Sequence, residues 1–204
     1  MSMDTTAISS GRSGLVIGLA TLACLSTACS HPPSTAVGET NPTPHKRYSL
    51  EAEIRDSPGP IDRVTADATY EVENTSCVPL TPVSGVRKIP RHVIALPLTR
   101  DRDGYKAEFF ADGMVDGDYY GQGVCHWKLI LVGFRAIRKA RQFDAVIRPF
   151  GEHAQGKSTT FFADSSYDRA SEGQIDTGLY DQSRFKHPEQ TFEIILTARE
   201  ANNE

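Results

Sequence analysis

Residue types that carry catalysis or hold metals are present in this sequence, but their spacing favours no particular reaction. The six histidines are scattered, and no two have a helical or hairpin spacing suited to a metal ion. The acidic stretch from Asp112 to Asp118 lacks the glutamate and regular spacing of a calcium loop. No serine has the surroundings of a hydrolase nucleophile. We therefore expect a binding protein without a metal or cofactor; a hydrolase whose triad assembles only in space is the weaker alternative.

The chemistry that the sequence does favour is the modification of a cysteine near the N-terminus. An apolar run from Leu15 to Leu25 follows Arg12. This run is shorter than the ~20 residues needed to span a bilayer, which is typical of an export signal. The three residues before Cys29 have small side chains, as cleavage sites do. We expect residues 1–28 to be a signal peptide.

Residues 25–30, LSTACS, resemble the lipobox of bacterial lipoproteins, in which a cysteine is acylated and becomes the first residue of the mature protein. The resemblance implies a lipid on Cys29, with Cys24 as the rival position, and Ser30 implies sorting to the outer membrane. Each buried methylene contributes ~0.8 kcal/mol, so several acyl chains would hold a polar domain at a membrane. Cleavage by ordinary signal peptidase, which would release a soluble protein, is the alternative. We expect a lipid-anchored envelope protein that faces the periplasm.

A tether and a disulfide are expected after the signal. Residues 29–47 contain four prolines and no apolar periodicity. Burial of apolar side chains therefore cannot offset the entropy cost of ordering them, and we expect a tether. Cys77 and Cys125 remain as an even pair in an oxidising compartment, and we expect them to be joined. Two reduced, buried cysteines are the alternative.

Residues 48–204 are expected to form one all-β domain. Apolar and polar side chains alternate from Tyr48 to Ile54 and from Val64 to Val72, the pattern of half-buried strands, and we expect these two strands to pair. A hairpin turn is expected at Asp101–Gly104, where the glycine can adopt a positive φ. Six further apolar runs are bounded mostly by turn residues: 92–98, 105–111, 124–132, 143–147, 159–163 and 191–197.

About eight short strands with one disulfide favour an immunoglobulin-like β-sandwich over a barrel. Trp127 lies two residues from Cys125, and a tryptophan beside a disulfide is a feature of such sandwiches. Because the order and spacing differ from those of antibody domains, only the architecture is expected to be similar. Polar, turn-rich stretches at 151–158 and 164–188 are expected to be surface loops.

Charge and aromatic residues indicate the kind of partner. A formal net charge of −4, with 22 basic and 26 acidic residues, disfavours nucleic acid. Two adjacent tyrosines on a glycine-rich loop and one basic cluster are the candidate partner-binding residues: Tyr119, Tyr120, Arg135, Arg138, Lys139 and Arg141. The basic cluster would suit acidic lipid headgroups or an acidic protein surface. Alternatively, the basic cluster is a solvated hairpin end that binds no partner. At least one of the tyrosines could likewise cap the core instead of binding a partner.

Residues 70–79, YEVENTSCVP, and 118–127, DYYGQGVCHW, resemble a group of proteobacterial envelope lipoproteins, mostly uncharacterised. Some similar small lipoproteins are immunity proteins, which neutralise toxic effectors that secretion systems deliver into the envelope. The resemblance covers roughly residues 64 to 132 and implies no catalytic residue. We therefore expect a membrane-tethered periplasmic protein that binds another protein, effector immunity being the most concrete version. A structural or assembly lipoprotein of the cell envelope is the alternative.

Overall fold

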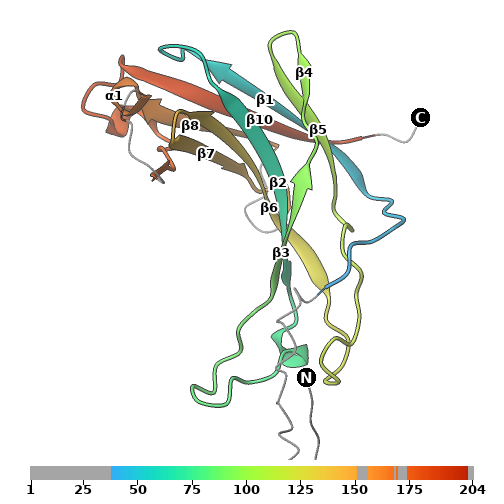
Figure 1. Cartoon of the computed structure of the whole chain (residues 1–204). Helices are drawn as coiled ribbons and strands as arrows, with labels where there is room; N and C mark the ends of the chain where they lie inside the picture. The colour runs from blue at the N-terminus through green and yellow to red at the C-terminus, as the bar shows by residue number, and fades with distance from the viewer. Residues whose placement is uncertain (1–37, 151–155, 168, 170–173, 202–204) are drawn as a thin grey trace, which may run out of the picture. The chain divides into compact units, whose positions relative to one another are not determined.

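Two sheets packed face to face make up the core of the protein, and all their strand pairs are antiparallel except the parallel pair of β7 with β9 (Figure 1). The computed structural model describes residues 38–150, 156–167, 169 and 174–201. The predicted signal peptide, both candidate acylation positions and residues 29–37 of the predicted tether lie outside these residues. In the described part of the chain, no helix is long and apolar enough to cross a membrane. The predicted all-β sandwich with one disulfide is confirmed.

Each sheet has five strands. The first has the order β4 (Thr99–Asp101), β5 (Gly104–Phe110), β1 (Arg47–Arg55), β10 (Thr191–Glu200) and β8 (Lys157–Ala163). The second has the order β3 (Arg91–Leu96), β2 (Arg63–Val72), β6 (Trp127–Arg138), β7 (Arg141–Ile147) and β9 (Ile175–Asp176). Three short helical segments complete the described elements: η1 (Thr75–Cys77), α1 (Asp164–Tyr167) and η2 (Gln182–Arg184).

The core lies between the sheets and follows from the alternation of the strands. In β7 every second residue is buried, and the same is true of most of β2. An aromatic group fills one end of the core, where Phe143 lies 5.0 Å from Phe192 and 5.4 Å from Phe162 between ring centroids, both edge to face. Side chains from the first sheet, such as Leu50, belong to the same buried cluster as Tyr70 of the second.

The expected pairing of the first two strands is wrong. β1 pairs with β5 and β10, so that Leu50 lies opposite Ala107 on one side and Ala198 on the other, whereas β2 belongs to the second sheet. The connection at residues 56–62 carries the chain from one sheet to the other instead of closing a hairpin. Alternation specifies which face of a strand is buried, but it does not specify the neighbour.

The other strand predictions are largely confirmed. All eight expected strands are present, and β4 and β9 bring the number among the described residues to ten. The turn at Asp101–Gly104 closes the β4–β5 hairpin as expected, but Gly104 does not adopt the positive φ that was expected there. β6 begins at Trp127, later than the expected 124, and continues to Arg138. The stretch 164–188 is less irregular than expected, since it contains α1, β9 and η2.

A second, smaller apolar cluster surrounds the disulfide, apart from the main core. Cys77 and Cys125 are bonded, with their Cα atoms 5.3 Å apart, and Val72 and Val78 are buried with them. Trp127 packs against this cluster and against the main core, as its position beside Cys125 suggested. The disulfide joins extensions of β2 and β6, which are neighbours in one sheet, whereas antibody domains bridge two sheets.

Part of the segment expected to be a tether lies against the sandwich. Thr40 forms an isolated bridge with Met114, and the N–H of Val115 donates to the carbonyl of Glu39 at 2.8 Å. The Gly38 backbone runs so close to the Trp127 ring that an added Cβ would lie 2.6 Å from it. Residues 38–46 therefore run along the segment that follows β5.

Candidate functional site

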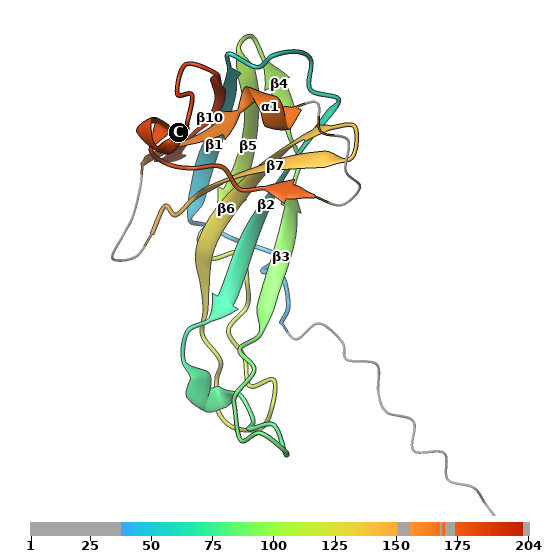
Figure 2. The same cartoon turned by 90° about the vertical axis from the view of Figure 1, so that its left-hand side faces the viewer.

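A projection beyond the main sandwich carries most of the exposed apolar side chains. We call it the apolar tip; it consists of residues 75–90, after β2, and residues 117–125, before β6 (Figure 2). Five of the eight exposed large hydrophobic residues of the described chain lie there. Their relative exposures are 55% for Leu80, 100% for Val83, 61% for Val86, 40% for Ile89 and 47% for Val124. Clusters of this kind mark interaction surfaces more often than single exposed residues do.

Covalent and polar contacts hold the tip in shape and leave these side chains outside. Beside the disulfide, the Asn74 amide donates to the carbonyl of Val124 at 2.7 Å and accepts from the N–H of His126 at 2.7 Å. The N–H of Thr81 donates to the carbonyl of Val86 at 2.9 Å, and Gly85 turns the chain there with φ 63°. The disulfide cluster and these hydrogen bonds thus hold the tip, whereas its five exposed aliphatic side chains are not buried.

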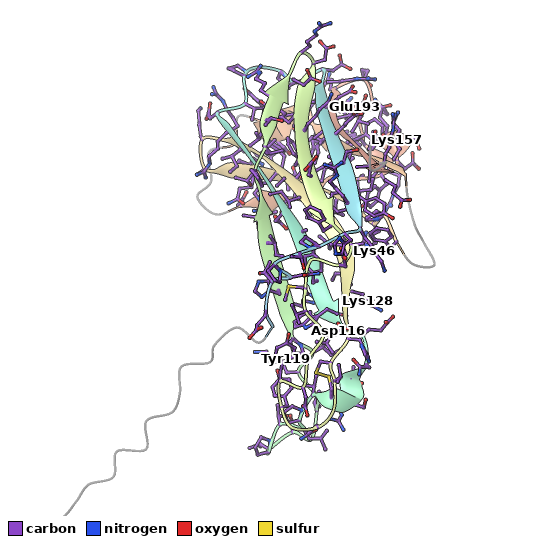
Figure 3. The ribbon with its side chains drawn as sticks, turned by 90° about the vertical axis from the view of Figure 1, so that its right-hand side faces the viewer. Lys46, Asp116, Tyr119, Lys128, Lys157 and Glu193 are labelled. Atoms are coloured by element: carbon purple, nitrogen blue, oxygen red, sulfur yellow. A yellow bond between two sulfur atoms is a disulfide. The ribbon has the colours of Figure 1, made fainter. Side chains whose placement is uncertain are left out.

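The two candidate tyrosines support the tip from its base. Tyr119 and Tyr120 are half-buried against the disulfide cluster. The Tyr119 hydroxyl donates to the carbonyl of Val115 and accepts from the N–H of Glu39 at 3.3 Å, and its ring packs edge to face on Trp127. Burial raises the pKa of Tyr120. Figure 3 places Tyr119 between the main sandwich and the end of the tip, near Asp116.

The candidate basic residues lie on and beside the β6–β7 hairpin, each against a carboxylate. Arg135 donates two hydrogen bonds to Asp144, at 2.7 and 3.1 Å, and hydrogen bonding to Asp144 raises the pKa of Arg135. The backbone N–H of Lys139 and the guanidinium of Arg138 both donate to Asp62.

The hydrogen bonds from Lys139 and Arg138 lower the pKa of Asp62, and the backbone bond from Lys139 has the largest effect. Arg141 is buried, with an ion pair to Asp176 at 3.5 Å. The structure thus places the two groups of candidate residues apart: the tyrosines lie at the tip, and the basic residues lie at the β6–β7 hairpin, where Arg135 and Arg141 pair across strands and Arg138 and Lys139 contact Asp62.

The acidic stretch from Asp112 to Asp118 accepts hydrogen bonds from backbone groups. Asp112 accepts from the N–H of His45 and of Lys46, both at 2.9 Å; burial opposes ionisation, but these bonds lower its pKa. Asp116 accepts from the N–H of Trp127 and contacts His126 at 2.7 Å. Within the described residues there is no group of three or more His, Cys, Asp or Glu that could hold a metal ion.

A cavity of about 740 Å³ opens along the edge of the sandwich between β3 and β5. We call it the seam cavity. Its walls are mainly apolar and include Tyr70, Ile94, Leu96, Ala107 and Phe109, with Thr40 to Pro44 at its border. The size falls within the range of 300–1,000 Å³ that is usual for ligand sites.

Sequence reasoning missed both the tip aliphatics and the seam cavity. Leu80, Val83, Val86 and Ile89 recur at every third position in a stretch with three prolines, which neither an amphipathic helix nor an alternating strand explains. That mismatch was the available signal. The seam cavity has no local signal, because its walls come from strands of different sheets.

The fold and these surfaces define a β-sandwich with a disulfide-linked apolar projection. Comparisons with models of protein families, with curated proteins and with solved structures found no match to this chain.

Proposed function

We propose that this chain is an exported, membrane-tethered protein that binds another protein in the cell envelope through its apolar tip. The observation that carries the proposal is the group of five exposed aliphatic side chains on a projection fixed by a disulfide. Exposed apolar surface on a rigid support suits binding, because little conformational entropy is lost when a partner covers it. Export supplies the oxidising compartment in which the disulfide persists.

The charge of the tip favours a protein over an anionic lipid surface as its partner. The tip has two basic side chains, Arg87, which donates to the carbonyl of Val78, and Lys88; the neighbouring Arg91 of β3 pairs with Glu71 at 2.7 Å. The described tip therefore does not present the cluster of four or more basic side chains that anionic lipids select. The lipid on Cys29 would supply the membrane attachment instead.

Effector immunity is the specific form of this function that we propose. It rests on the resemblance of residues 70–79 and 118–127 to a group of envelope lipoproteins, since some similar small lipoproteins are immunity proteins. In this form the tip binds a toxic effector and neutralises it in the periplasm.

The test is a challenge of cells that lack the gene with toxin-producing siblings. Cells complemented with the wild-type gene should survive, whereas those carrying Val83→Asp with Val86→Asp should not. Ile175→Asp is the matched control, because Ile175 is 55% exposed but lies in β9. Equal survival with and without the gene would exclude immunity. A weakened envelope in the absence of any attacker would support a structural role.

A further inference from the structure

We propose that the seam cavity is a second binding site, which accepts an extended peptide segment of a partner protein as an added strand on β5. The segment would pair with the backbone of β5 and place every second side chain between the two sheets. This site is separate from the apolar tip and extends the function proposed above.

The first observation is that the two neighbours of β5 differ in length. On one side β1 pairs with β5 from Tyr105 to Phe110. On the other side β4 pairs only with Gly104 to Lys106. Residues 107–110 of β5 thus have a strand on one side and, within the described residues, none on the other.

The second observation is the direction of the free backbone groups. The N–H of Ala111 donates to the carbonyl of Lys46 at 2.8 Å. The backbone N–H and carbonyl groups of odd-numbered β5 residues therefore point towards β1, and those of even-numbered residues point away from it. Two side-chain bonds agree: Thr99 donates to the carbonyl of Lys106 at 3.3 Å, and the Tyr70 hydroxyl donates to that of Phe110 at 2.6 Å. Between them, the N–H and carbonyl of Glu108 face away from β1, towards the seam.

The third observation is that the cavity beside this edge of β5 is lined mainly by apolar side chains. Ile94 and Leu96 of β3 are half-buried and pack against the main core, so their side chains form the opposite wall. The Tyr70 hydroxyl donates to the carbonyl of Phe110, and burial raises the pKa of Tyr70 to about 12, so this side chain stays neutral. An unpaired strand edge next to an apolar cavity suits a peptide that bonds through its main chain and buries alternate side chains.

The same observations give the chemistry of the ligand. Four residues, matching 107–110, would lie against the free edge. Apolar side chains at alternate positions would enter the cavity, and polar ones between them would face solvent. A fatty acyl chain could fill the apolar volume, but it could not bond to the N–H and carbonyl of Glu108.

The test uses the full chain and labelled six-residue peptides with threonine alternating with valine, leucine or phenylalanine. We expect at least one peptide to bind, as measured by fluorescence anisotropy, and to slow hydrogen exchange at the Glu108 and Phe110 amides. Glu108→Pro removes the N–H that faces the cavity and leaves the β1 ladder intact, so it should weaken binding at least 10-fold. Glu108→Ala keeps that N–H and is the matched control, with binding expected to be unchanged.

A second arm does not depend on the folding of the proline variant. Peptides methylated on the backbone nitrogens that would pair with β5 should bind at least 10-fold more weakly than the parent peptide. Absence of binding by every peptide, equal binding by the methylated forms, or filling of the cavity by laurate in place of peptide would overturn the proposal. Val83→Asp in the tip should leave peptide binding unchanged, so failure at the seam and failure at the tip remain distinguishable.

Discussion

The two apolar clusters of this protein are stabilised in different ways. The main core is closed by strands distant in sequence and is filled by side chains such as Phe143, Leu50 and Ile194, all fully buried. The cluster around Cys77 and Cys125 has four buried residues and depends on a covalent bond between neighbouring strand extensions. A small cluster cannot support a projection by burial alone, and the disulfide there frees the aliphatic side chains of the tip to face outward.

The largest expected effect comes from a cavity in the main core. Phe143→Ala removes a ring that contacts Phe162 and Phe192, and it should lower the free energy of unfolding by about 3–5 kcal/mol. Urea denaturation followed by circular dichroism measures this loss. Tyr180→Ala, at an exposed aromatic residue, is the control and should change it by less than about 0.5 kcal/mol. Equal losses would mean that the main core does not dominate stability.

Loss of the disulfide should act mainly on the tip. The double variant Cys77→Ser with Cys125→Ser opens a loop with a sequence separation of 48 and should cost about 2–4 kcal/mol. Because the main core does not include these residues, the sandwich should stay folded while the tip becomes sensitive to protease. Limited proteolysis with mass spectrometry locates the cleavage sites. First cleavage within β1 or β10 would contradict the separation of the two clusters.

A smaller and pH-dependent effect is expected on the outer face of the second sheet. Burial raises the pKa of Asp67, although the nearby Arg135 opposes this shift. An acid whose pKa is higher in the folded state begins to destabilise the fold as pH rises through its unfolded-state pKa, and the full loss is present above its folded-state pKa. Asp67→Asn should therefore stabilise the protein at pH 7, and the gain should vanish below pH ~3.5, where the acid is protonated in both states. Thermal unfolding across this pH range measures it; a gain that persists at low pH would exclude this cause.

The smallest effect on stability is expected at the tip. Val83 is fully exposed, so Val83→Asp should change the free energy of unfolding by less than about 0.5 kcal/mol. The same variant should weaken partner binding, since an aspartate would lose its hydration in an apolar interface. Denaturation and survival assays on one preparation test both statements. A large loss of stability would show that the tip contributes to the core after all.

Much of the fold followed from the sequence, because alternation is a local property of each strand. Tyr48 to Ile54 and Val64 to Val72 show their buried faces directly, and the pair of cysteines left after the predicted signal peptide indicated the disulfide. The candidate sites were harder to predict from the sequence. The partners of Arg135 and Arg138 are Asp144 and Asp62, which the spacing of the basic residues alone could not reveal.

Sequence alone determined eight of the ten described strands, the buried faces of β1 and β2 and the position of the β4–β5 turn, since these depend on residues a few positions apart. Only the tertiary structure decided that β1 joins β5 and β10, that the disulfide lies outside the main core and that β5 keeps an unpaired edge beside a cavity. These features depend on which distant strands meet, and the same alternating pattern is compatible with many neighbours.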